Sequence, residues 1–422
     1  MMEQGWNKLD NAAKIFPSSV AKFKSQVFRI SCDLTEAVDA VLLQKALCET
    51  LQVFTVFRSI LRRGWFWYYL EGTALVPEVR EEYKYPCARL YDVSYRGLLF
   101  EVTYFGNRIN LEVFHALTDG TGAMQFFKLL LAKYLSKKYG LAEPELDYDA
   151  SRTQMQDDSF YKYYTNDKEK TKKQPRVKGC RIRMPRHAED RTRIIGGSMP
   201  VVQVLDAAHR YGATVTAFLS ACLMTAIAGE LPARAKKRPI SLAVPVNLRN
   251  FFPSVSARNF FNLVSVQHAF DREPASLEEL CRALDGELKC QLTKENLLAQ
   301  LNQFSKIEHN LFVKPVPLVF KDIVLKAAYI ASGNETTATI SNVGVVSMPE
   351  EVSPYIQKFA IYSSTDKIQA CVCSYAGTLT VGFSSAFVST DIERRFFRIL
   401  TDLGVDVEIE CNFDDEAAGA KL

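Results

Sequence analysis

The segment 109–122 is the feature that most restricts how this 422-residue chain can fold. Apolar and polar residues alternate over 109–114, and a period of two is typical of a β-strand. His115 continues the apolar side of this alternation, so we expect its imidazole to point into the protein interior. Two glycines then interrupt the pattern before a helical pattern begins at Ala123. The segment therefore predicts a strand, a glycine-rich turn and a helix, with a histidine at the end of the strand.

The size and composition of the chain indicate a globular protein of two domains. A chain of 422 residues is long for one hydrophobic core and long enough for two domains of about two hundred residues each. Hydrophobic residues make up 48% of the chain and charged residues 24%, which is typical of soluble globular proteins. Nucleic-acid-binding domains are strongly basic, and the formal net charge here is only +4, so we expect no nucleic-acid partner.

The N-terminal sequence and the cysteines favour the cytoplasm. The first residues lack the basic start and apolar run of a signal peptide. The most apolar segment, 213–228, is interrupted by serine and threonine and predicts a buried helix rather than a membrane span. The ten cysteines contain no CxxC pair and are typical of reduced thiols in the cytoplasm.

Both halves of the chain mix helical and strand patterns. In the first half, side chains at 33–36 are placed to cap a helix that runs to Leu51. In the second half, Thr390 and Glu393 have the spacing of a capping box that opens the last long helix. Strands are predicted at 65–70, 98–105, 240–246, 367–375 and 378–385, and further helices at 126–134 and 201–211.

A segment rich in lysine and arginine separates the two halves. Its basic residues, from Lys168 to Arg186, are typical of a solvated connecting segment, and an anionic partner such as a nucleotide cofactor or an acidic carrier protein is the alternative. We therefore predict an N-terminal lobe at 1–150, a basic connection at 151–192 and a C-terminal lobe at 193–422.

Three interpretations compete for His115 and Asp119. The first is a metal site, because residues four apart share one face of a helix and could bind the same ion. The preceding strand and the two glycines argue against a helix here, and the other four histidines are not in ligand spacing relative to His115. We therefore predict no metal. The second is structural: a core histidine satisfied by a backbone carbonyl, and an aspartate that caps the next helix. The third is a general base, with Asp119 holding the loop through a buried ion pair.

The general-base interpretation needs few other groups. An imidazole titrates near pH ~6.5 and can take a proton from a hydroxyl that attacks a carbonyl, provided that a donor stabilises the oxyanion. The sequence contains no GxSxG nucleophile motif, so a covalent acyl-enzyme has no evident carrier. It also lacks the GxxxxGK[ST] and GxGxxG loops that bind nucleoside triphosphates and dinucleotides.

The chain resembles the superfamily of CoA-dependent acyltransferases that includes chloramphenicol acetyltransferase, the plant BAHD enzymes, wax ester synthases and condensation domains of peptide synthetases. It looks most like the bacterial alcohol-acetyltransferase-like branch. The resemblance covers nearly the whole chain. The HxxxDG motif alone is moderately specific for the superfamily, and the motif together with the other segments, in this order, is considerably more specific. These segments are 33–69, 115–120, 245–249, 258–261 and 341–344.

The resemblance implies an α+β fold of two chloramphenicol-acetyltransferase-like lobes. Each lobe would have a mixed, largely antiparallel sheet with flanking helices, and an active-site tunnel would follow the seam. The implied activity is transfer of an acyl group from acyl-CoA to an alcohol or amine by direct attack. Acyl-CoA would be a cosubstrate, and no cofactor would be bound permanently. With no carrier domain attached, the expected donor is free acyl-CoA or a carrier protein in trans.

The resemblance also implies roles for particular residues. His115 would be the general base, Asp119 would form a structural ion pair with Arg249 from the second lobe, and Gly120 would let the backbone approach the substrate. Ser341, Asn342 and Asn247 are candidates for oxyanion hydrogen bonds or for the tunnel wall, and the first two equally fit a role in shaping a turn.

The chain departs from two branches of the superfamily. Phe114 stands where condensation domains usually have a first histidine, which points away from peptide-bond formation. The sequence 341–344 stands where BAHD enzymes have DFGWG. The alternative to an enzyme is a non-catalytic, condensation-like domain that binds a carrier protein or ligand through its tunnel and basic segment.

Overall fold

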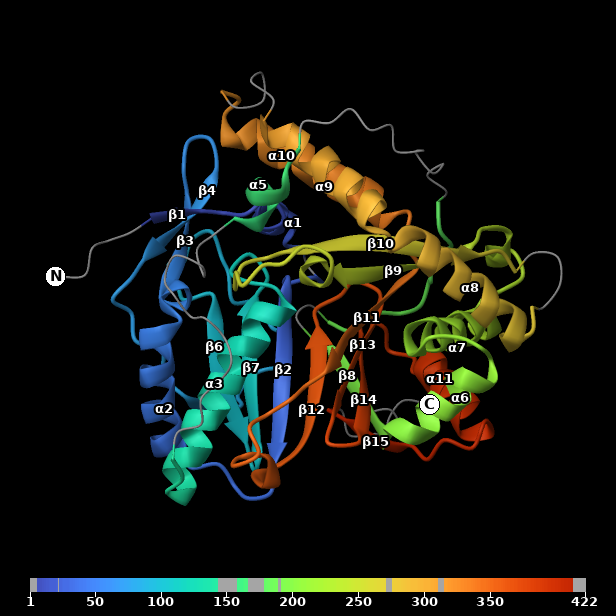
Figure 1. Cartoon of the computed structure of the whole chain (residues 1–422). Coiled ribbons are helices and arrows are strands. Elements are labelled where there is room, and N and C mark those ends of the chain that lie inside the picture. Colours follow the sequence, from blue (N-terminus) through green and yellow to red (C-terminus); the bar gives the residue numbers. More distant parts are fainter. Residues whose placement is uncertain are drawn as a thin grey trace.

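The computed structural model of this chain describes residues 6–21, 23–142, 158–165, 178–188, 191–270, 275–309 and 315–412. Two large sheets stand side by side, each with its own hydrophobic core and flanking helices (Figure 1). The predicted α+β class with two lobes is confirmed. Most of the basic run from Lys168 onward lies outside the described residues.

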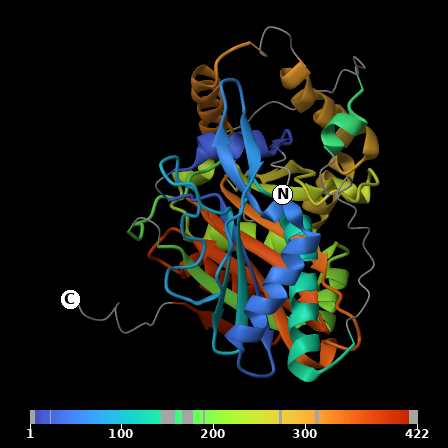
Figure 2. The ribbon, with the colours of Figure 1, turned by 90° about the vertical axis from the view of Figure 1, so that its left-hand side faces the viewer.

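The first sheet places His115 at its centre. Its strand order is β12-β2-β7-β6-β5, and β7 (Arg108–Phe114) pairs antiparallel with both neighbours, β2 (Val27–Leu34) and β6 (Phe100–Phe105). Helices α2 (Ala40–Val53) and α3 (Gly120–Tyr139) run side by side against this sheet (Figure 2). The remaining elements here are β5 (Arg80–Glu81), the three-stranded sheet of β1 (Trp6–Lys8), β4 (Tyr68–Gly72) and β3 (Ser59–Arg63), the short helix α1 (Phe16–Ser19), and the 3-10 helices η1 (Ala13–Ile15) and η2 (Thr55–Phe57).

The second sheet has the order β10-β9-β11-β13-β14-β8-β15. A hairpin of β9 (Ile240–Asn247) and β10 (Phe261–His268) forms its edge nearest to the residues that contact His115. Its other strands are β8 (Arg193–Pro200), β11 (Ala338–Val345), β13 (Ile368–Tyr375), β14 (Thr378–Ser385) and β15 (Glu408–Cys411). The helices are α5 (Ser159–Tyr163), α6 (Val201–Arg210), α7 (Val215–Glu230), α8 (Leu277–Gln291), α9 (Lys294–His309), α10 (Leu318–Gly333) and α11 (Asp391–Asp402), with η3 (Ala235–Lys237), η4 (Leu248–Asn250) and η5 (Ser353–Tyr355).

One strand from the predicted C-terminal lobe pairs in the first sheet. β12 (Ile356–Ser363) belongs to the predicted C-terminal lobe 193–422, yet it pairs antiparallel with β2 in the first sheet. It also contacts β13 and β14 of the second sheet. The two sheets are therefore not built from two uninterrupted halves of the sequence, and β12 joins them.

Two predicted helix caps are wrong, and one helix begins earlier than predicted. Residues 33 and 34 end β2, and the true cap of α2 is Asp39, whose Oδ1 accepts hydrogen bonds from Val41 N and Leu42 N at 2.9 and 3.0 Å. Thr390 makes no side-chain cap at α11, because its backbone, with φ −111° and ψ 14°, is not in the extended conformation of a capping residue. Its predicted partner Glu393 is buried inside the lobe. α3 begins at residue 120, three residues before the predicted start.

The predicted buried helix around 213–228 is present as α7. No single helix within the described ranges is long and apolar enough to cross a membrane, and α6 and α7 meet that test only as a pair bent by 80°.

Candidate functional site

His115 lies directly after β7, at the seam between the two lobes. Its backbone N–H donates to the carbonyl of Gln26 at 2.8 Å. The imidazole is stacked on Phe16, with ring centroids 4.4 Å apart and planes 17° apart, and it also contacts Phe28 and Phe261 at 5.0 and 5.4 Å. The ring therefore points into an aromatic interior, as the strand pattern predicted, although the residue keeps some accessible surface.

A chain of polar groups orients the imidazole. Nδ1 of His115 lies 3.1 Å from Oδ1 of Asn259, and Nδ2 of Asn259 donates to Oδ2 of Asp10 at 3.3 Å. Because the amide nitrogen of Asn259 is directed at Asp10, its carbonyl oxygen faces the histidine. This oxygen only accepts hydrogen bonds, so the network assigns the proton to Nδ1. Nε2 is then left with its lone pair.

The surroundings keep this histidine neutral. Burial among the aromatic rings lowers the pKa of His115 below its usual value of 6.5, and this effect is larger than the opposing effects of Asp119 and Asn259. The imidazole is therefore in its basic form at pH 7.

Asp119 combines two roles that the sequence interpretations had kept apart. Its Oδ1 caps α3 by accepting a hydrogen bond from Gly122 N at 3.0 Å. Its Oδ2 forms a buried ion pair with Nη1 of Arg249 at 2.7 Å and accepts a hydrogen bond from Phe260 N at 2.8 Å. The predicted contact with Arg249 is present, and one carboxylate both starts a helix of the first lobe and binds the second lobe.

Arg249 and Asn247 extend this connection. Nε and Nη2 of Arg249 donate to the carbonyl of Ser256 at 3.2 and 2.8 Å. Asn247 accepts a hydrogen bond from Arg249 N at 3.1 Å, and its Nδ2 donates to Oγ1 of Thr121 on α3 at 3.1 Å. Asn247 therefore lies at the seam, where both polar atoms of its side chain already form hydrogen bonds within the protein.

The two glycines of the turn differ in what surrounds them. A Cβ on Gly120 would meet no atom within 4 Å. A Cβ on Gly122 would lie 2.1 Å from the carbonyl oxygen of Ala257 and 2.2 Å from Oγ1 of Thr118. Gly122 is therefore the glycine that close packing between the lobes requires, and the space beside Gly120 is compatible with the predicted approach of a substrate.

Ser341 and Asn342 lie on β11, and the structure records no contact of either with His115 among the described residues. Nδ2 of Asn342 donates to Oγ1 of Thr216 at 3.0 Å, and its Oδ1 accepts a hydrogen bond from Gly344 N at 3.0 Å. Gly344 has a φ of +89°, which favours glycine. Asn342 therefore shapes a bulge in β11. This agrees with the second role that the sequence allowed for it, which was to shape a turn.

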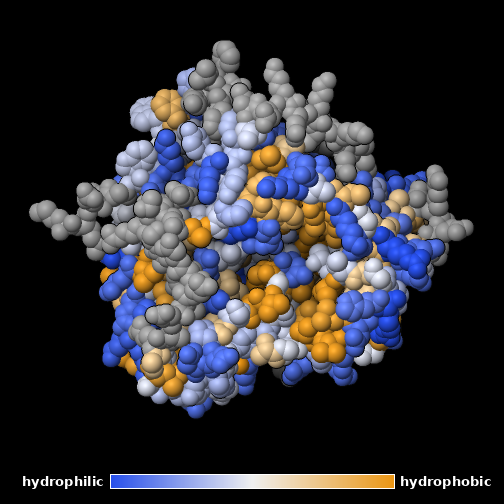
Figure 3. Space-filling model, in the orientation of Figure 1, coloured by the Kyte–Doolittle hydropathy of each residue, from blue (hydrophilic) through white to orange (hydrophobic). Residues whose placement is uncertain are grey.

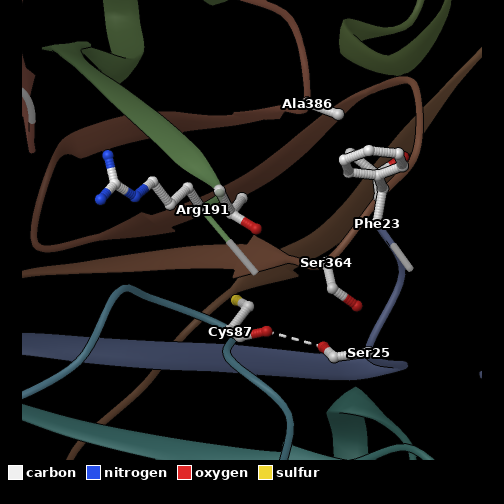
Figure 4. Close-up of a pocket in the computed structure, with 8 residues that line it drawn as sticks. Phe23, Ser25, Cys87, Arg191, Ser364 and Ala386 are labelled. Atoms are coloured by element: carbon white, nitrogen blue, oxygen red, sulfur yellow. Dashed lines mark hydrogen bonds between the residues drawn. The ribbon is translucent and has the colours of Figure 1, made fainter. Parts of the chain in front are cut away.

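His115 lines neither of two cavities among the described residues, and the tunnel stays a prediction. The space-filling view shows a hollow lined by hydrophobic residues below the β9–β10 hairpin (Figure 3). A separate narrow cavity lies beside Phe23, Ser25 and Cys87, where Ser25 Oγ donates to the carbonyl of Cys87 at 2.6 Å (Figure 4). His115 does not line this cavity.

The described part of the basic run contacts the protein itself. The guanidinium of Arg186 lies 5.3 and 5.4 Å from the rings of Phe23 and Phe387, and Arg181 donates to Asn334. Within the described residues, no group of three or more potential ligand side chains could hold a metal ion.

Sequence reasoning missed Asp10, Asn259 and Phe16. Asn259 was part of a segment that carried the family resemblance, but no role was assigned to it. Asp10 had one local signal, because it precedes a short helical turn and accepts a hydrogen bond from Ala13 N at 2.7 Å. The contact between Asp10 and Asn259 spans 249 positions, so no local pattern reveals it.

Comparisons with known proteins agree with this architecture. Residues 202–394 match the family model "Phthiocerol/phthiodiolone dimycocerosyl transferase C-terminus", and a search of curated proteins finds no significant match. TRI101 of F. sporotrichioides, crystallised with coenzyme A and T-2, is similar with a TM-score of 0.64 and 11% identity over 96% of this chain and 99% of that one.

Two other solved structures extend the similarity. Polyketide synthase associated protein 5 from Mycobacterium tuberculosis has a TM-score of 0.58 and 15% identity over 93% of this chain and 96% of that one. The first condensation domain of the calcium-dependent antibiotic synthetase has a TM-score of 0.60 and 14% identity over 96% and 99%. The chain therefore has the two-lobed fold of the superfamily of CoA-dependent acyltransferases and condensation domains, as the resemblance predicted.

Proposed function

We propose that this protein transfers a short or medium acyl group from acyl-CoA to an alcohol, with His115 as the general base. The observation that carries the proposal is the state of the imidazole. It lies at the seam of an acyltransferase-like fold, its Nδ1 faces the carbonyl oxygen of Asn259, and burial lowers its pKa. Within the described residues, Nε2 makes no recorded hydrogen bond and is available to a substrate.

The proposed reaction is a direct attack in a complex of both substrates. Nε2 of His115 takes the hydroxyl proton while the alcohol oxygen forms a bond to the thioester carbonyl carbon. The tetrahedral intermediate then expels the CoA sulfur as the carbon–sulfur bond breaks, and the imidazolium returns its proton to the thiolate. The products are an ester and free CoA, and no acyl-enzyme forms.

The remaining residues have supporting roles in this proposal. Phe16 covers one face of the imidazole and excludes water, which would otherwise compete with the alcohol for the acyl group. Asp119 and Arg249 hold the turn after His115, and Gly120 leaves room for substrate. Ser341, Asn342 and Asn247 stay candidates for the tunnel wall or for donors to the oxyanion.

Release of free thiol from acetyl-CoA and octanoyl-CoA across a panel of alcohols tests this function. We expect release that depends on an alcohol and that falls by about 10²–10⁴-fold in His115→Ala. His209→Ala is the matched control, because His209 lies in the last turn of α6 away from the seam, and it should keep the wild-type rate. Intact-mass measurement with acyl-CoA alone should show no acylated protein.

Equal rates in wild type and His115→Ala would contradict the proposed base, and accumulation of an acyl-enzyme would contradict direct attack. If no acyl donor is turned over while an acylated carrier protein binds and is released by salt, the non-catalytic alternative is favoured instead.

A further inference from the structure

Helix α10 presents an apolar face to the outside of the molecule. Its five large apolar side chains on this face are between 55% and 66% exposed, and three exposed alanines lie between them on the same side. The face continues at the β3–β4 turn, where Trp65 is 87% exposed. The residues on the outward face of the helix are Val319, Phe320, Ile323, Val324, Ala327, Ala328, Ile330 and Ala331.

Polar contacts on the opposite face hold α10 in this orientation. Leu318 N donates to the carbonyl of Trp65 at 2.9 Å, and Asp322 accepts a hydrogen bond from the hydroxyl of Tyr68 at 3.0 Å. At the other end, Nζ of Lys367 donates to the carbonyl of Gly333 at 2.6 Å. The helix lies beside the β3–β4 hairpin at the edge of the molecule (Figures 1 and 2). The outward apolar face is therefore part of an anchored helix.

The comparison with α7 shows how unusual this arrangement is. Both helices have 16 residues and are largely apolar. α7 buries eleven of its residues, whereas α10 buries only Leu318 and Lys321. Monomeric soluble proteins seldom expose a contiguous apolar patch of several large side chains, and such patches mark interaction surfaces.

Two lysines lie at or near the margin of this face. Lys326 is exposed at its margin, and Nζ of Lys24 lies 4.9 Å from the ring of Tyr329 on α10. Asp322, the acidic residue of the helix, lies on the inner face, where Arg63 and Tyr68 contact it. An apolar helical face with exposed tryptophan and phenylalanine and basic residues at its margin has the composition of an interfacial helix.

We propose that the outward face of α10, together with Trp65 and Phe66, docks on a membrane surface that contains anionic lipid. The apolar side chains enter the boundary between headgroups and acyl chains, and Lys24 and Lys326 lie near the lipid phosphates. Lys24 and Lys326 favour anionic lipid as the occupant, because they add positive charge beside the apolar side chains. This proposal is independent of the acyl transfer proposed above.

Sedimentation of the full chain with vesicles tests the docking surface. We expect wild type to pellet with vesicles of phosphatidylcholine and phosphatidylglycerol in a 7:3 ratio, and to pellet less with phosphatidylcholine alone. Ile323→Asp combined with Val324→Asp should weaken binding by at least about tenfold, because apolar area is lost and negative charge is added. Lys326→Glu should weaken binding only to the anionic vesicles.

Val202→Asp is the matched control, since Val202 on α6 is 65% exposed and lies outside this face. It should bind like wild type, and circular dichroism should show the same helix content in all variants. The proposal is overturned if wild type stays in the supernatant with anionic vesicles, or if the double variant pellets as well as wild type. Sedimentation equilibrium that shows a dimer lost in the double variant, without vesicle binding, would assign the face to a second copy and would equally overturn it.

Discussion

Two buried carboxylates near His115 are held by neighbouring parts of the second lobe, but not equally well. Asp119 forms a 2.7 Å ion pair with Arg249 and accepts a backbone hydrogen bond from Phe260. Asp10 lies 3.7 Å from the guanidinium of Arg258 and accepts two hydrogen bonds from Asn259 at 3.3 Å.

The consequence of this difference is a contrast in response to pH. Burial raises the pKa of Asp10 to about 6, and the charge of Arg258 only partly opposes this effect. One side of the histidine is thus held by a close ion pair, and the other by a carboxyl group that titrates just below neutral pH. The seam therefore has a closely paired carboxylate at the loop and a titratable carboxyl group behind the residue that orients the imidazole.

The largest expected effect follows removal of the Asp119 carboxylate. Asp119→Ala should lower the free energy of unfolding by about 3–5 kcal/mol, because Arg249 would be left buried without its partner. Asp39→Ala is the matched control, since Asp39 also caps a helix but lies in an exposed cap, and it should cost only about 0.5–2 kcal/mol. Denaturant unfolding measures both, and equal losses would show that Asp119 acts only as a cap.

The titration of Asp10 should give the next largest effect. Its pKa is higher in the folded chain than the ordinary value of 3.8, so the folded state binds more protons between pH 4 and pH 6, and stability falls as pH rises through that window. The free energy of unfolding of wild type minus that of Asp10→Asn should therefore fall by about 2 kcal/mol between pH 4 and pH 7. A difference that is constant with pH would show that Asp10 is not the group responsible.

Alanine substitutions at the two glycines of the turn should differ in their effect on stability, because only Gly122 is closely packed. Gly122→Ala should cost about 1–3 kcal/mol, because the new methyl group meets the backbone of Ala257 and the side chain of Thr118. Gly120→Ala should leave thermal unfolding nearly unchanged, since no atom lies within 4 Å of its new methyl group. The reverse order of the two variants would contradict the close approach of the lobes at residue 122.

The last prediction concerns catalysis rather than stability, and it is a specific effect of Asn259 on the imidazole. Asn259→Ala should lower kcat by about tenfold to a hundredfold with little change in KM, because the imidazole is no longer oriented through Nδ1. Steady-state kinetics together with the pH profile of kcat distinguish this from unfolding. An unchanged kcat with a raised KM would assign Asn259 to substrate binding instead.

The sequence predicted the elements around the histidine because their patterns are local. The alternation over 109–114 predicted the strand β7, and the helical patterns at 126–134 and 201–211 predicted helices that are present as parts of α3 and α6. The contact between Asp119 and Arg249 was also predicted, but only through the family resemblance and not from any period.

The sequence could not predict what depends on distant packing. The strand β2 was missed, and its last residues were assigned to a helix cap. Its polar residue Arg29 is buried in ion pairs with Glu82 and Glu112, which are distant in the sequence. The Asp10–Asn259–His115 chain requires that the N-terminal segment pack against the second lobe. The outward apolar face of α10 is invisible to periodicity, because an apolar helix looks the same whether it is buried or exposed.

The most direct test of the account is the protonation state of His115, observed by ¹⁵N NMR of histidine-labelled protein. The His115→Ala variant identifies the signal among the five histidines. We predict a neutral ring at pH 7 with the proton on Nδ1 and a midpoint of titration below 6.5. An imidazolium at pH 7, or a neutral ring with its proton on Nε2, would contradict the claim that the two lobes hold this histidine as a ready base.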